Sequence, residues 1–222
     1  KSNSKLKEGD IVYLEGQTIQ LTLKEKKNYL CVFEFSESVL SVLDSFGEVP
    51  LPPYIKRPAV PVDEERYQTV YADPEKLNSV AAPTAGLHFD LSHLDLLKSK
   101  GIQFTEITLN IGLGTFKPLK VNKIEDHVIH KERISVNSIA AETIMKAKNE
   151  GRRVVAIGTT VLRCLESVAT SSQVIAPYEG ETNLFVYPGY QFKIVDALLT
   201  NFHLPKSSLF LLVSAFGGSE RI

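Results

Sequence analysis

The chain has 222 residues, a formal net charge of −1 and an apolar fraction of 43%, which is ample for a packed core. The near-neutral charge argues against indiscriminate coating of nucleic acid but allows a local basic patch. No apolar run is long enough to span a bilayer and no secretory signal is visible, so we expect a cytoplasmic protein without a membrane partner. Cys31 and Cys164 form no CxxC pair and lie in apolar surroundings, which predicts two reduced thiols in the core.

Residues 9–35 are expected to form short β-strands, because apolar and polar residues alternate around Leu21. A polar hairpin loop is expected at residues 24–28. Short strands in series predict a small barrel, or part of one, within residues 1–50. Ser36 is expected to cap the helix that follows.

Residues 49–55 contain three prolines in four positions, so this segment is expected to be extended and stiff and to mark a domain boundary. Arg66, Tyr67 and Gln68 follow. They are interpreted as a polar strip that faces a substrate. A solvated turn with an ion pair is the alternative.

Residues 79–89 combine small residues with a titratable ring. Pro83 and Gly86 fix a turn, and Gly86 leaves a backbone N–H accessible. Thr84 adds a hydroxyl, and His88 lies between two apolar neighbours. Either this is a tight loop that enters a helix with one ordinary polar contact from His88, or it is part of a site.

Residues 107–111 are predicted to be a strand that runs into Gly112, Gly114, Thr115 and Phe116. Strands that end in glycines and a threonine commonly bring backbone N–H groups against a ligand. The longer dinucleotide-binding pattern is absent, because no third glycine opens a helix at the required offset.

His127 and His130 lie three residues apart, with Glu132 two residues further on. No HExxH pattern or cysteine pair supports zinc, so no metal site is predicted. An acid–base or substrate-binding role for His130 and Glu132 is the hypothesis that we adopt. A plain surface turn is the alternative.

Residues 153–157 form an apolar run that predicts a strand buried on both faces. It leads into Gly158, Thr159 and Thr160, then into a helix, and residues 184–187 are expected to be the next strand. Strand–helix–strand units form parallel sheets, and ligands bind beyond the carboxyl ends of such strands. A carboxylate or phosphate is therefore expected at the N-terminus of this helix.

Arg163 and Glu166 lie one turn apart on the same helix, where a simple ion pair would contribute about 0.2–0.5 kcal/mol. Residues 195–199 are another apolar stretch, and it runs into a cluster that contains His203. Several strand ends thus carry polar side chains, which favours an enzyme.

The amino-acid sequences of these clusters closely resemble those of the S-adenosylmethionine:tRNA ribosyltransferase-isomerase family of queuosine biosynthesis (QueA). The resemblance covers nearly the whole chain, strongly over residues 47–218 and weakly over residues 1–46. It rests on motifs that occur in order at residues 47–55, 67–72, 80–89, 112–116, 158–160, 163, 165–167, 188–190 and 200–207. Family members usually have His where this chain has Asn110, so Asn110 is given no proton-transfer role.

The family resemblance implies an α/β catalytic domain at residues 51–222, with a mostly parallel sheet flanked by helices. Residues 1–50 would be part of a small inserted β-barrel domain. The resemblance also implies further N- and C-terminal segments outside the 222 residues, consistent with a first residue Lys1 and a single methionine, Met145.

The implied reaction transfers and isomerises the ribosyl moiety of S-adenosylmethionine. The acceptor is 7-aminomethyl-7-deazaguanine at the wobble position of tRNA, the product is epoxyqueuosine, and adenine and methionine are released. S-adenosylmethionine is consumed as a substrate, no cofactor or metal is implied, and a monomer is expected.

The resemblance and the residue chemistry together give three sets of candidate residues. The proton-transfer set is His88, His130, Glu132 and His203. The set that binds S-adenosylmethionine or the deazaguanine base is Arg66, Tyr67, Gln68, Thr84, Gly86, Gly112, Gly114, Thr115, Phe116, Gly158, Thr159, Thr160, Arg163, Asn201 and Phe202. The tRNA-binding set is Lys117, Lys120, Lys123, Lys131 and Arg133, with an ordinary solvated face as its alternative.

Three other interpretations remain open. A nucleotide-binding oxidoreductase on a doubly wound sheet lacks its glycine fingerprint here. A non-catalytic RNA-binding module lacks the expected aromatic and basic surface motif. An inactive fragment would carry the same residues without being able to act.

Overall fold

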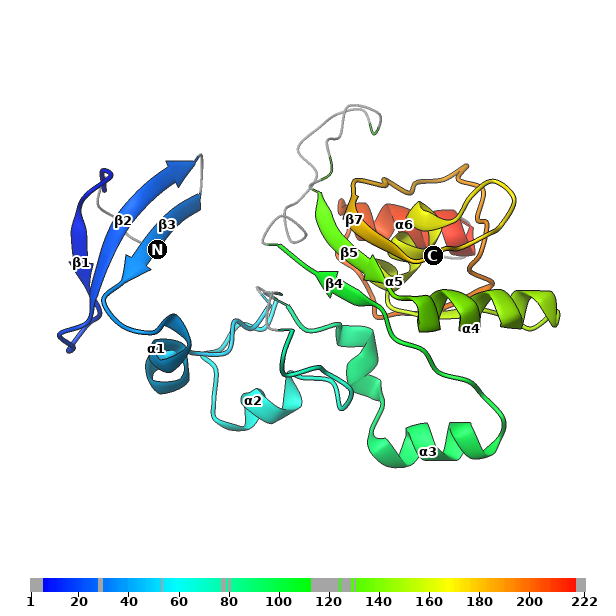
Figure 1. Ribbon diagram of the computed structural model, residues 1–222, viewed down its shortest axis with the longest axis horizontal. Coiled ribbons are helices and arrows are strands. Elements are labelled where there is room, and N and C mark those ends of the chain that lie inside the picture. Colours follow the sequence, from blue (N-terminus) through cyan, green and yellow to red (C-terminus); the bar gives the residue numbers. More distant parts are fainter. Residues whose placement is uncertain are drawn as a thin grey trace. The chain divides into compact units, whose positions relative to one another are not determined.

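A computed structural model describes residues 6–27, 30–52, 54–76, 79, 81–112, 124, 129 and 131–218. The chain divides into two compact units, Lys1–Val49 and Pro50–Ile222 (Figure 1). The boundary lies in the proline-rich segment, where the prolines lack the N–H groups that would bond to either unit.

The first unit is an antiparallel meander followed by a helix. Its elements are β1 (Ile11–Tyr13), β2 (Gln20–Lys27), β3 (Leu30–Phe35) and α1 (Val39–Phe46). The strands pair in the order β1-β2-β3, and Ile19 and Leu23 are buried. The expected short strands are therefore confirmed, while closure into a barrel is not.

Three local predictions for this unit are wrong. Residues 24–27 continue β2 instead of forming a loop, because residues 25–27 pair with β3 after an irregularity in the register at Lys24. The helix begins after Ser38, and the hydroxyl of Ser36 instead accepts a hydrogen bond from the Gln20 N–H at 3.0 Å. Cys31 lies exposed on β3, whereas Cys164 is a buried free thiol as predicted. Burial raises the pKa of Cys164 to about 12.

The second unit is a mixed α/β structure. Its helices are α2 (Val62–Arg66), the 3₁₀ helix η1 (Thr84–His88), α3 (Leu91–Ser99), α4 (Ser138–Asn149), α5 (Thr159–Val168) and α6 (Ser208–Gly217). Its strands are β4 (Thr108–Asn110), β5 (Glu132–Val136), β6 (Val155–Ile157), β7 (Tyr178–Thr182) and β8 (Ala197–Leu199). Among the described residues β4-β5-β7 form an antiparallel sheet and β6-β8 a parallel pair (Figure 1). A mostly parallel sheet is not confirmed.

Helix α5 lies at the centre of the second unit, because it contacts β4, β6, β7 and α6. Leu162, Cys164 and Leu165 of this helix are buried in the main core. Residues of β5, α4, β6 and α6 complete that core. The side chains of α5 therefore connect both sheets.

A strand–helix–strand unit with parallel strands was predicted correctly, but its second strand was assigned to the wrong residues. Residues 184–187 form no strand, and β6 instead pairs in parallel with β8. Val186 packs into the core although residues 184–187 have no strand partner. Burial without strand pairing therefore accounts for this apolar run. Asn137 and Ser207 cap α4 and α6, since each side chain accepts a backbone N–H of its helix.

Candidate functional site

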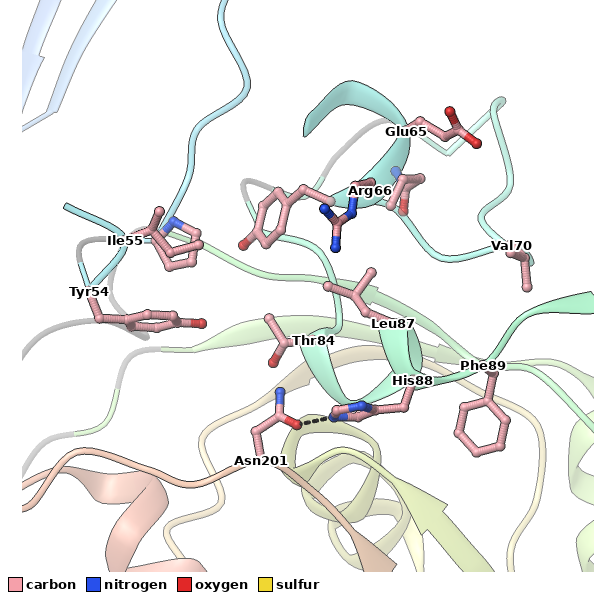
Figure 2. Close-up of a pocket in the computed structure, with 13 residues that line it drawn as sticks. Tyr54, Ile55, Glu65, Arg66, Val70, Thr84, Leu87, His88, Phe89 and Asn201 are labelled. Carbon is pink, nitrogen blue, oxygen red and sulfur yellow. Dashed lines mark hydrogen bonds between the residues drawn. The ribbon is translucent and has the colours of Figure 1, made fainter. Parts of the chain in front are cut away.

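A pocket of about 520 Å³ opens in the second unit between η1, the end of α2 and the proline-rich segment (Figure 2). Its size suits a nucleoside-sized ligand. The predicted site residues that line it are Arg66, Tyr67, Gln68, Thr84, His88 and Asn201. Three separate sequence motifs therefore meet in one pocket.

Gly86 allows η1 to pack closely beneath the pocket. It is buried, and a Cβ at this position would collide with the hydroxyl of Tyr71 and lie 2.9 Å from Cγ2 of Thr69. Any larger residue would push η1 away from these neighbours. Gly86 thus positions Thr84 and His88, which were predicted together with it.

His88 is exposed and bonded to Asn201, 113 residues further along the chain. Nε2 of His88 and Oδ1 of Asn201 are 2.6 Å apart, and Figure 2 shows this bond at the base of the pocket. Because an amide oxygen can only accept, Nε2 carries the proton in this pair and Nδ1 of the neutral ring keeps its lone pair. Asn201 therefore orients a ring that can take up a proton.

Arg66 supplies a positive charge to the pocket. It lies at the C-terminal end of α2, and Figure 2 shows its guanidinium directed toward Leu87 and the pocket interior. No ion pair of Arg66 occurs within the described ranges. The carboxylate of Asp63, one turn earlier, accepts hydrogen bonds from Nη1 and Nη2 of Arg57, at 2.6 and 2.8 Å.

The Asp63 carboxylate is hydrogen-bonded to Arg57, and Arg66 acts on it only as a nearby positive charge. The hydrogen bonds from Arg57, with another from the Val60 N–H, lower the pKa of Asp63 to about 2. The carboxylate is therefore ionised and already satisfied. An ion pair was considered for this turn. It exists, but it joins Arg57 and Asp63, and Arg66 lines the pocket.

Two tyrosines form part of the pocket wall. Burial raises the pKa of Tyr67, and the neighbouring Tyr54 phenol adds to that shift. Tyr54 and Glu65 line the pocket but were not predicted as site residues. Tyr54 belongs to the proline-rich motif that carries the family resemblance, and that membership was the available signal.

The carboxyl ends of β6 and β8 meet beside η1. The Gly158 N–H donates to the Leu199 carbonyl at 2.8 Å, and a Cβ on Gly158 would lie 3.8 Å from that of Ala85 in η1. Gly158 has φ +103°, which favours glycine, and no side chain caps the helix α5 that follows it. The first N–H groups of α5 thus lie at the edge where the sequence predicted an anion.

His203 and Phe202 differ sharply in their surroundings. His203 is half-buried, its Nε2 lies 3.1 Å from the Thr200 hydroxyl, and burial lowers its pKa below the usual 6.5. The neutral ring is therefore favoured near pH 7. Phe202 does not line the pocket, and its side chain is fully exposed (107%).

Glu132 and Arg163 form a buried ion pair away from the residues that line the pocket. Glu132 Oε2 and Arg163 Nη1 are 3.0 Å apart, both side chains are only 4% exposed, and Arg163 Nε donates to the Leu184 carbonyl at 3.2 Å. The ion pair considered between Arg163 and Glu166 is wrong. These two side chains have separate partners on different segments.

Glu166 binds the segment that leads into β8. Its two carboxylate oxygens accept the backbone N–H groups of Lys193 at 2.8 Å, Ile194 at 3.0 Å and Val195 at 3.0 Å. The Tyr190 hydroxyl also donates to Glu166 at 3.4 Å, and burial together with this carboxylate raises the pKa of Tyr190 to about 12. Glu166 therefore fixes the chain just before β8, which ends at the pocket edge.

Several predicted residues are only partly tested by the geometry. Gly112 is exposed, and the neighbouring Ile111 N–H donates to the Ser79 hydroxyl at 3.3 Å, so the glycine motif begins beside the 79–89 segment. Lys131, just before β5, and Arg133 on β5 are exposed and paired with Glu181 and Glu179 of β7. The predicted residues outside the described ranges are Gly114, Thr115, Phe116, Lys117, Lys120, Lys123 and His130.

In the described part of the chain, no group of three or more His, Cys, Asp or Glu side chains could hold a metal ion. His127 and His130, which suggested a metal site, lie outside that part. No described helix is both long and apolar enough to cross a membrane.

Comparison with known proteins gives matches over the whole chain. A family described as "Queuosine biosynthesis protein" matches residues 1–222. An S-adenosylmethionine:tRNA ribosyltransferase-isomerase from Acinetobacter baylyi is 46% identical over 223 residues, which is 100% of this chain and 65% of the relative. One of the same name from Legionella pneumophila is 45% identical over 221 residues, covering 99% of this chain and 64% of the relative.

A crystal structure of S-adenosylmethionine tRNA ribosyltransferase from Thermotoga maritima matches with a TM-score of 0.49 and 27% identity. It covers 97% of this chain and 58% of that protein. The chain thus spans about 65% of the length of the curated relatives that it matches.

Proposed function

The chain belongs to the queuosine biosynthesis protein family, and from this membership we propose that it acts in tRNA modification as an S-adenosylmethionine:tRNA ribosyltransferase-isomerase. It transfers and isomerises the ribosyl moiety of S-adenosylmethionine onto 7-aminomethyl-7-deazaguanine at the wobble position, forming epoxyqueuosine and releasing adenine and methionine. The observation that carries this proposal is the pocket in which Arg66, His88 and Asn201 meet.

The reaction needs groups that move protons near neutral pH. A base removes a proton from the 5′-carbon next to the sulfonium, and an acid protonates the departing adenine. His88 suits the role of base, because Asn201 holds its Nε2 and leaves Nδ1 able to accept. The neutral form of His203 is favoured near pH 7, because burial lowers its pKa, so this ring is a second candidate.

Glu132 was predicted for the same proton-transfer set. Its burial and its ion pair with Arg163 favour a role in holding β5 against α5. Glu132→Gln keeps the shape of the side chain and removes its charge. Lower stability with near-normal turnover of the folded enzyme supports the holding role, whereas lost turnover at unchanged stability supports proton transfer. His130 stays a prediction.

The carboxylate of the methionine moiety requires a positive partner. Arg66 is such a partner in the pocket, and the N-terminus of α5 at Thr159 and Thr160 is another. Arg66→Gln is expected to weaken S-adenosylmethionine binding in isothermal titration, with the exposed Arg153→Gln as the matched control. Undiminished affinity in Thr159→Val/Thr160→Val would remove the helix terminus from the proposal.

The tRNA is proposed to approach the second unit at the exposed charged side chains that join β5 and β7. Lys131 and Arg133 are paired with Glu181 and Glu179 there, so tRNA phosphates would have to displace these carboxylates. We further propose a monomeric cytoplasmic enzyme with no cofactor. The finer fold proposal is a mostly parallel catalytic sheet with an inserted barrel, to which the β1-β2-β3 sheet would belong.

Chromatographic measurement of adenine release tests the proposal. Release from S-adenosylmethionine that depends on tRNA carrying the aminomethyl-deazaguanine base is expected. His88→Ala should lower turnover by about 10²–10⁴-fold if His88 transfers a proton. Binding of tRNA without adenine release would instead favour the RNA-binding module.

A further inference from the structure

Phe202 projects into solvent from a turn that is held on both sides. The residue before it, Asn201, is bonded to His88 at 2.6 Å. The residue after it, His203, is bonded to the Thr200 hydroxyl at 3.1 Å. Both neighbours are partly buried, while the Phe202 side chain is fully exposed. The turn is therefore fixed with its aromatic ring outward.

An outward phenylalanine has large apolar area to bury, on the order of 150–250 Å² for an aromatic side chain. Leu204, two residues further on, is also exposed. Lys206 follows with an exposed side chain and forms no ion pair in the part of the chain that the structure describes. An exposed aromatic ring with a cation four residues further along the chain is a combination that suits single-stranded nucleic acid.

Phe202 directly follows Asn201, which lines the pocket. For the aminomethyl group to react in that pocket, the wobble nucleotide must leave the stack of the anticodon loop. Its neighbours then each lose one stacking partner. A ring fixed at the rim of the pocket is placed to replace that partner.

We propose that Phe202 stacks on a nucleotide adjacent to the wobble position while the target base occupies the pocket, with Lys206 near the loop phosphates. This inference rests on the proposed function, because it requires the target base to enter this pocket. It changes the role of Phe202 from the predicted contact with S-adenosylmethionine or the deazaguanine base to a contact with the flanking RNA. Phe202 is thus a positioning residue.

The test uses the whole chain and anticodon stem-loop RNAs with 2-aminopurine on either side of the wobble nucleotide. The unchanged protein should alter the fluorescence of one of these probes. Phe202→Ala should abolish that change and weaken binding roughly tenfold, the scale of one lost base–aromatic stack. Phe202→Tyr should retain both properties, and Leu204→Ala is the matched control for an exposed apolar residue.

Other results would overturn the inference. Phe202→Leu that behaves like the unchanged protein would show an apolar contact without stacking. A changed oligomeric state or melting temperature in Phe202→Ala would assign the ring to a protein contact instead. Unchanged RNA binding in Phe202→Ala would remove Phe202 from the interface.

Adenine release distinguishes this inference from the proposed function. Phe202-dependent fluorescence without adenine release would support stacking and overturn the transferase reaction. Adenine release that depends on the modified tRNA, with no effect of Phe202→Ala on binding or fluorescence, would overturn stacking alone. Failure of the unchanged protein to bind the stem-loop would overturn both.

Discussion

Two arginines in the second unit show how the same side chain is used in opposite ways. Arg163 on α5 is buried, paired with Glu132 at 3.0 Å and bonded to the Leu184 carbonyl. Arg66 at the end of α2 lies exposed in the pocket, and the described residues offer it no ion pair. The buried charge uses its binding capacity within the fold, whereas the exposed charge keeps it for a ligand.

Other polar side chains near these two arginines differ in the same way: those near Arg163 bind within the protein, and those near Arg66 are available to a ligand. On α5, Glu166 accepts three backbone N–H groups and a tyrosine hydroxyl, so its carboxylate is engaged within the protein. In the pocket, His88 has one fixed nitrogen and one that can accept a proton. Charged residues in the core must be paired because burial removes their hydration, and pocket residues escape that requirement.

The largest effect is expected from breaking the buried pair. Arg163→Met should destabilise the fold by about 3–5 kcal/mol, because the Glu132 carboxylate stays buried without its cation. Urea unfolding followed by circular dichroism measures the loss. The double variant Arg163→Met/Glu132→Leu should recover most of it. A loss in the single variant no larger than that of a surface substitution would show that Glu132 does not need this cation.

Glu166→Gln should have the next largest effect. Its amide offers one acceptor oxygen where the carboxylate offers two, so at least one of the three backbone N–H groups loses its partner, costing about 1–3 kcal/mol. Hydrogen exchange at Lys193, Ile194 and Val195 should accelerate. Glu142→Gln, at an exposed position of α4, is the control. Unchanged exchange would contradict the proposed anchoring of the chain before β8.

His203 should give a smaller effect that depends on pH. Because its pKa in the fold lies below 6.5, the unfolded chain binds more protons, and stability falls as pH drops from about 6.5 toward the lowered value. His203→Gln should remove this part of the pH dependence. Urea unfolding at about pH 7.5 and about pH 5.5 measures the difference. An equal loss in both proteins would contradict the lowered pKa.

Arg66→Gln should change stability least, by under about 0.5 kcal/mol, since an exposed side chain that forms no ion pair with the described residues contributes little to the fold. The same substitution is expected to reduce affinity for S-adenosylmethionine. Thermal unfolding and titration of the same sample provide both measurements. A large loss of stability would place Arg66 in the same class as Arg163 and remove the contrast between the two regions.

Local sequence features predicted many elements of the fold. Asn137 and Ser207 follow the general preference for a short polar side chain before a helix, where each accepts one of the first backbone N–H groups. The helix after Gly158 was also predicted, whereas the strand predicted at residues 153–157 is shorter, Val155–Ile157, and is not buried on both faces, because Val155 is 52% exposed. Residues 184–187 misled the prediction, because an apolar run indicates burial but does not identify a strand partner.

For the candidate site, the motifs identified Arg66, Thr84, His88 and Asn201, which the structure brings into one pocket. They did not reveal that Arg163 pairs with Glu132, that Glu166 holds residues 193–195, or that Phe202 is fully exposed and does not line the pocket. Each of these depends on which segments pack together. Tyr54 was likewise missed, although its motif had been noted.

By itself the sequence determined that a helix begins directly after Gly158, that short strands occupy residues 9–35 and which motifs carry the family resemblance. These features depend on backbone preferences and on residues a few positions apart. Only the tertiary structure decided which charged groups neutralise each other and which stay available to a ligand. That choice depends on distances between residues far apart in the chain, such as His88 and Asn201 at a separation of 113, and on the burial that makes pairing necessary.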